Sequence, residues 1–177
     1  ALELDNLVAA CRRAVARGDS ERAVHAYCAT WEVLDLQGPC ALGITLGAQV
    51  LAIDGLDASQ RAAALLSRAT SLRRAGRGEE AGAEFERALA LSREMRDRRR
   101  EAGVLNNLGN LHMLDSQYAD AQKYYADAAK ADPKDPEILV NLAQAYKAGK
   151  NVDKAKEAFT QAQKVDPAMA NKYKALG

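Results

Sequence analysis

Apolar residues along the chain recur at spacings of three, four and seven, which is the spacing that places side chains on one face of an α-helix. Short polar segments that contain Gly, Asp or Pro separate these apolar stretches. The alternation of apolar and polar residues that is typical of β-strands does not compete with this pattern. The sequence therefore predicts an all-α protein of about ten helices, over residues 3–17, 20–35, 39–54, 58–75, 78–95, 98–114, 117–131, 136–148, 152–165 and 168–176.

Residues 102–135 and 136–169 are two copies of one pattern, because they superpose at an offset of 34 residues without a gap. Small residues coincide at Gly109 and Ala143, and large aromatic residues coincide at Tyr125 and Phe159. A period of this length is typical of antiparallel helix pairs that stack side by side and complete each other's core. The Asp-Pro dipeptides at 135–136 and 166–167 predict helix starts in which the Asp caps and the Pro is the first helical residue.

Looser copies of the same spacing precede these two. Ala81, Phe85 and Ala88 mark one copy, and Ala23 and Tyr27 mark another. We therefore expect one domain over residues 1–177, with repeat units at 4–37, 62–101, 102–135 and 136–169, an extra helical region at 38–61 and a capping helix at 168–176.

The repeated positions resemble the tetratricopeptide repeat, whose motif has a large apolar residue, then Leu-Gly, an aromatic, an Ala, an aromatic, an Ala and a closing Pro. The third unit carries this motif at Leu105, Leu108, Gly109, Tyr118, Ala121, Tyr125, Ala128 and Pro133. The second unit departs from it, because Arg68 stands where the motif has Leu. The resemblance implies a right-handed α-solenoid in which the first helix of each pair lines a concave groove for an extended peptide or a partner's helix.

Carried onto this chain, the resemblance implies a polar and basic groove. Its expected lining is Arg12, Arg13, Thr70, Arg73, Arg74, Asn106, Asn107, Asn110, Asn141, Gln144 and Lys147, with Leu66, Met113 and Val140 beside them. Asn and Gln amides bond both donors and acceptors of a peptide backbone, and the planar forks of Arg match carboxylates. We expect a non-enzymatic module that binds a partner protein or an acidic or C-terminal peptide segment. The alternatives are a self-assembling scaffold and an engineered chimera without a native partner.

The basic residues are divided in an unusual way, since all fifteen Arg lie between positions 12 and 100 and all ten Lys lie between 123 and 174. Solvated helix faces accept either residue, so folding alone does not require this division. One hypothesis is a fusion of two sources with a seam between residues 109 and 123, and the alternative is one natural gene with a drifted C-terminal half. The Arg-rich part resembles the repeat regions of large bacterial signalling proteins, which implies a sensing or docking role.

Candidate chemistry is sparse. Gly38 to Thr45 is similar to a phosphate-binding loop but lacks its Lys, and helix packing explains these glycines better. His112 stands where the repeat has a packed Tyr, and no Cys, His and carboxylate cluster has the spacing of metal ligands. We therefore expect no enzyme, no cofactor and no metal.

The same sequence indicates the surroundings of the chain. Three cysteines without a Cys-x-x-Cys pair favour a reducing, cytoplasmic setting. No apolar stretch is long enough for a bilayer, so no membrane role is expected. The basic run from Arg96 to Arg100 is interleaved with acids, which argues against nucleic-acid binding.

Overall fold

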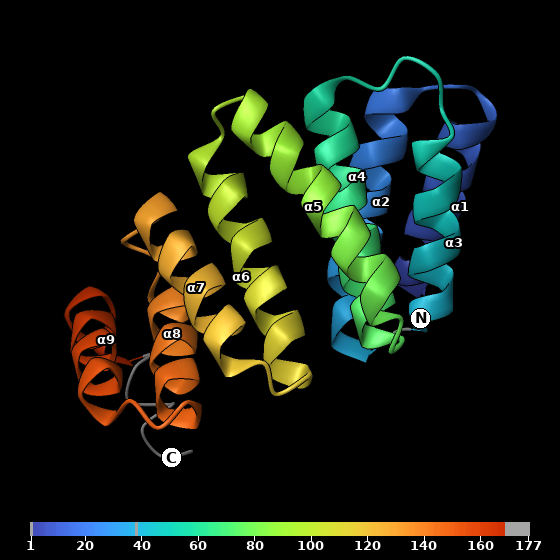
Figure 1. Ribbon diagram of the computed structural model, residues 1–177. Coiled ribbons are helices and arrows are strands. Elements are labelled where there is room, and N and C mark those ends of the chain that lie inside the picture. The colour runs from blue at the N-terminus through green and yellow to red at the C-terminus, as the bar shows by residue number, and fades with distance from the viewer. Residues whose placement is uncertain (1, 38, 169–177) are drawn as a thin grey trace. The chain divides into compact units, whose positions relative to one another are not determined.

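The computed structural model describes residues 2–37 and 39–168, and this part of the chain is built from helices alone (Figure 1). Nine helices lie in it: α1 (Leu2–Ala16), α2 (Ser20–Gln37), α3 (Cys40–Leu51), α4 (Ala58–Arg74), α5 (Gly78–Glu94), α6 (Arg98–Leu114), α7 (Tyr118–Ala131), α8 (Pro136–Ala148) and α9 (Val152–Val165). The predicted all-α fold is confirmed. The tenth predicted helix, 168–176, lies outside the described residues apart from Ala168.

The predicted helix bounds agree closely with the structure, and α6, α8 and α9 match at both ends. The largest difference is at α3, which ends at Leu51 although the apolar pattern predicts helix to residue 54. The chain turns back at this point, with Gly55 at a φ of +79°, and Ile53 and Leu56 are buried in the loop. Because these loop residues are apolar and pack into the core, the sequence pattern continues past the end of the helix and predicts a helix that is too long.

Side-chain caps fix several helix starts. Asp57 accepts from the Gln60 N–H at 2.8 Å, and the Gln60 side chain accepts from the Asp57 N–H at 3.0 Å, which forms a capping box at α4. Asp135 accepts from the backbone N–H groups of residues 137 and 138 at 2.9 and 3.2 Å, directly before Pro136. The predicted Asp-Pro start of α8 is thereby confirmed.

The turns within the helix pairs repeat one backbone geometry. Each turn places one residue in the left-handed region, at Gly18, Gly76, Ser116 and Lys150. The last two positions are 34 residues apart, which is the repeat length of the sequence. The repeat is therefore a property of the backbone as well as of the core positions.

The chain divides into two compact units, residues 1–96 and 97–177. In the first unit, α1 packs on α2 and α4 packs on α5, while α3 packs on both α2 and α4. The buried Tyr27 of α2 reaches α3, where its hydroxyl donates to the Gly43 carbonyl at 2.9 Å. The extra helical region predicted between the first two repeat units is therefore an integral layer of this unit.

The second unit contains two helix pairs, α6 with α7 and α8 with α9, and α7 packs against α8. Gly109 of α6 permits the close approach of α7, because a Cβ on it would lie 2.6 Å from Cε1 of Tyr125. The Tyr125 ring, 2% exposed, belongs to the same core cluster as Ala121, Leu142 and Ala143. The small-residue and aromatic positions of the sequence repeat thus meet as predicted.

Candidate functional site

The first helices of the two pairs in unit 97–177 bring two predicted groove residues together. Asn141 on α8 donates through Nδ2 to Oδ1 of Asn106 on α6, at 3.0 Å. Both side chains are half-buried, and Gln144 and Lys147 follow on α8 as exposed residues. We call the set formed by Asn106, Asn110, Asn141 and Gln144 the asparagine surface.

The other two asparagines of α6 have partners within their own helix pair. Oδ1 of Asn110 accepts from the Tyr125 hydroxyl of α7 at 2.7 Å, and Asn107 donates to the Gly103 carbonyl at 2.9 Å. The Tyr125 contact fixes the orientation of the Asn110 amide. Because the ring below it is buried, this amide is held in place at the edge of the asparagine surface.

Two residues that the sequence placed in the groove are buried instead. Thr70 is 5% exposed, and its hydroxyl donates to the Leu66 carbonyl at 3.0 Å, so the side chain is satisfied by its own helix. Val140 is 1% exposed and packs in a cluster with Leu139 and Ala162. Because they are buried, neither side chain is exposed to a ligand. The sequence could not predict this burial, because helix periodicity gives the direction of a side chain but not the neighbour that covers it.

The four arginines that the sequence predicted for the groove lie in unit 1–96. Arg12 and Arg13 are exposed on α1. Arg73 is half-buried and Arg74 is exposed, and both lie at the C-terminal end of α4. Cationic side chains at this end of a helix interact favourably with the helix dipole.

The same unit contains a site that the sequence did not predict. A pocket of about 630 Å³ opens between α3, α4 and α5, and we call it the Arg68 pocket. Its lining residues are Ala48, Leu51, Ala52, Arg61, Leu65, Arg68, Glu84, Arg87, Ala90 and Leu91. The only signal in the sequence is Arg68 itself, at the motif position where Leu is usual.

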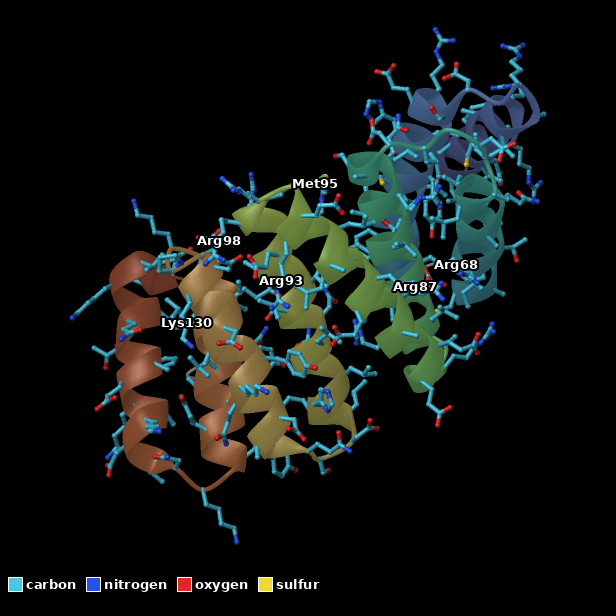
Figure 2. The ribbon with its side chains drawn as sticks, turned by 45° about the horizontal axis from the view of Figure 1, so that its top comes forward. Arg68, Arg87, Arg93, Met95, Arg98 and Lys130 are labelled. Carbon is cyan, nitrogen blue, oxygen red and sulfur yellow. The ribbon has the colours of Figure 1, made fainter. Side chains whose placement is uncertain are left out.

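Arg68 is held between two helices that flank its own. Its Nη1 forms an ion pair with Oε1 of Glu84 on α5, and its Nε donates to the Ile44 carbonyl of α3 at 3.2 Å. Figure 2 shows Arg68 and Arg87 close together where these helices meet. Glu84 is 7% exposed. Burial raises the pKa of its carboxyl, and the positive charges of Arg68 and Arg87 oppose this shift.

His112 packs against an aromatic side chain, as its position at a packed Tyr of the repeat predicts, and Cys11 lies in the core. The His112 ring stacks on Tyr124 with a centroid distance of 5.1 Å, and Nδ1 lies 2.5 Å from Oε1 of Gln117. Cys11 is fully buried, which raises the pKa of its thiol to about 11. Within residues 2–37 and 39–168, no group of three or more His, Cys, Asp or Glu side chains could hold a metal ion.

None of the helices that the structure describes has the length and hydropathy needed to cross a bilayer.

Comparisons with known proteins agree with this geometry. Two family models, both described as tetratricopeptide repeat, match residues 60–134 and 112–176. No curated protein sequence matches the chain significantly. Among solved structures, BtubC from P. vanneervenii is similar with a TM-score of 0.75 at 21% identity, over 90% of this chain and 71% of that one.

Two further structures are similar at lower TM-scores. A MamA protein gives 0.62 at 16% identity, over 95% of this chain and 94% of that one. PilF of Pseudomonas aeruginosa gives 0.65 at 18% identity, over 92% of this chain and 76% of that one. At these identities the likeness concerns the fold alone. The family models, the 34-residue repeat and the packing of Gly109 against Tyr125 together establish that this chain belongs to the tetratricopeptide repeat family.

Proposed function

We propose that the chain docks a short extended peptide segment of a partner protein on the asparagine surface of α6 and α8. The contact between Asn106 and Asn141 carries this proposal, because it joins the first helices of two successive repeats through their amide groups. Tetratricopeptide repeats are in general protein–protein interaction modules, and membership of the family supports a role of this kind for the chain.

The chemistry of the asparagine surface suits a peptide backbone. A primary amide offers two N–H donors and an oxygen with two lone pairs, and the bond between Asn141 and Asn106 uses one donor and one acceptor of this pair. The remaining groups match the N–H and C=O groups of an extended chain, which carries them at regular intervals. Lys147 is exposed on α8, about one helical turn beyond Gln144. Its positive charge favours an acidic residue in the bound segment.

The test is binding to an array of acidic and neutral peptides, followed by titration of the tightest binders with the purified chain. Asn141→Ala removes the amide that links the two helices, and we expect binding to weaken by about fivefold to tenfold, the value of one hydrogen bond. Gln161→Ala removes an exposed amide of α9 and is the matched control. A peptide that binds both variants equally well would contradict docking on this surface.

Self-assembly is the alternative, and the same samples test it. Sedimentation over a hundredfold concentration range would show a rising mass for a self-assembling scaffold. For a docking module, we expect a constant mass until the peptide is added. A mass that rises with concentration, together with no peptide bound, would favour the scaffold.

A further inference from the structure

We propose that the Arg68 pocket is a second docking site, which takes an acidic side chain flanked by aliphatic residues in a peptide segment of a partner protein. It goes beyond the proposed function, because it lies in unit 1–96, on α3, α4 and α5, and uses none of the residues of the asparagine surface.

One arginine of the pocket lining, Arg68, is held in place by its neighbours. α3 and α5 both pack on α4, and Arg68 lies on α4 between them. Gly47 of α3 makes room for the stem of Arg68, since a Cβ on this glycine would lie 2.9 Å from both Cβ and Cδ of Arg68. The guanidinium is anchored by the Ile44 carbonyl of α3 and by the Glu84 carboxylate of α5. A cation held in this way loses little conformational freedom when a ligand binds.

Glu84 supplies a polar group that the described chain leaves without a hydrogen bond. Its Oε1 is paired with Arg68, whereas its Oε2 is buried and has no hydrogen-bond partner within the residues that the structure describes. Buried carboxylate oxygens are seldom left in this state, because desolvation is then uncompensated. An N–H donor from a bound segment would satisfy Oε2.

The charge of the pocket selects an anion. Three arginines, Arg61, Arg68 and Arg87, line the pocket together with one acidic residue, Glu84. Arg61 is half-buried and Arg87 is exposed, and neither forms an ion pair with the acidic residues of the described part of the chain. Guanidinium groups bind carboxylates through paired N–H groups, so Arg61 and Arg87 favour an acidic side chain in the ligand.

The walls select an aliphatic surface around that anion. Leu51, Leu65 and Leu91 line the pocket together with Ala48, Ala52 and Ala90. Inorganic phosphate or a nucleic-acid backbone would leave these apolar walls uncovered. A peptide with an acidic residue between aliphatic residues supplies the carboxylate, the backbone N–H and the apolar contact together.

The experiment uses a fluorescent pentapeptide, Gly-Leu-Asp-Leu-Gly, with the fluorophore on its amino end and an amide on its carboxyl end, and the same peptide with Asn in place of Asp. Fluorescence anisotropy with the full chain is expected to show at least about fivefold tighter binding of the Asp peptide. Arg87→Glu changes an exposed side chain and is expected to weaken binding of the Asp peptide about tenfold or more. Arg99→Glu makes the same charge change at an exposed position of α6 and is expected to leave it unchanged.

Three results would overturn the proposal: equal binding of the Asp and Asn peptides, equal effects of Arg87→Glu and Arg99→Glu, or displacement of the Asp peptide by inorganic phosphate as readily as by unlabelled peptide at matched ionic strength. Asn141→Ala separates this site from the asparagine surface. We expect Asn141→Ala to weaken binding of the Asp peptide less than Arg87→Glu does, and a loss of binding equal to that of Arg87→Glu would assign the peptide to the asparagine surface and reject the pocket.

Discussion

A single departure from the repeat motif changes the chemistry of unit 1–96. Leu at position 68 would be one more core side chain. Arg68 instead brings a positive charge, which forms an ion pair with Glu84, and a longer stem, for which Gly47 leaves room. Replacement of a buried ion pair by apolar residues is often neutral or stabilising, so a contribution to stability is a weak explanation for this pair. A binding role in the Arg68 pocket gives the pair a reason that packing alone does not.

The titration of Glu84 gives a test at this scale. Burial raises the pKa of the Glu84 carboxyl above its ordinary value of 4.5, so the folded chain holds this proton more tightly than the unfolded chain. The resulting stabilisation is present below the ordinary pKa and is lost as the pH rises through the folded pKa. In Glu84→Gln this titration is absent. We therefore expect the free energy of unfolding of the variant, minus that of the wild type, to increase between about pH 4 and pH 7.

Urea unfolding followed by circular dichroism at four pH values measures this difference. Glu79→Gln, an exposed acid in the first turn of α5, controls for the loss of one negative charge. A difference that falls with pH for Glu84→Gln would mean that attraction to Arg68 outweighs burial.

At the scale of the element, α6 contains two glycines with opposite surroundings. A Cβ on Gly109 would lie 2.6 to 2.9 Å from three atoms of the Tyr125 ring, whereas a Cβ on Gly103 would meet nothing within 4 Å. The ring cannot swing away freely, because it is buried and its hydroxyl bonds Asn110. Close approach of α6 and α7 is therefore specific to one glycine of the helix.

We expect Gly109→Ala to lower the free energy of unfolding by about 1 to 3 kcal/mol through overpacking. Gly103→Ala brings the same gain in helix propensity without the clash. We expect it to raise the free energy of unfolding by roughly 0.5 to 1 kcal/mol. Thermal and urea unfolding of the two variants measure this pair. If both variants changed stability in the same direction by the same amount, the contact between Gly109 and Tyr125 would not be limiting.

At the scale of the whole molecule, charge is nearly balanced, with a formal net charge of +1. From residue 1 to 122 the chain has fifteen Arg against seventeen acids, so the Arg-rich part does not present a broad positive field. The separation of Arg from Lys along the chain is a fact of the sequence. A fusion of two sources stays a hypothesis for its origin, and one uninterrupted natural gene for the chain would refute it.

This balance predicts weak attraction to polyanions. We expect filter binding to duplex DNA at 50 mM salt to show no complex at micromolar protein, because few phosphate contacts are available to release counterions. A dissociation constant below about 1 μM that weakens steeply with salt would contradict this expectation.

The sequence by itself determined the features that depend on neighbours along the chain. Helix positions follow from the spacing of apolar residues, and the start of α8 follows from Asp135 beside Pro136. The repeat also predicted the contact of Gly109 with Tyr125, although sixteen residues separate them, because a fixed period carries the geometry of one helix pair to the next. These inferences hold because a helix has one geometry whatever surrounds it.

Only the tertiary structure decided which side chains meet across helices and which are covered. It buried Thr70 and Val140, paired Asn106 with Asn141, and placed α3 and α5 against α4 so that the Arg68 pocket lies between them. Periodicity gives the direction in which a side chain leaves its helix, but not the distance to the next helix or the partner found there. The candidate binding chemistry depends on those distances, whereas the fold class does not.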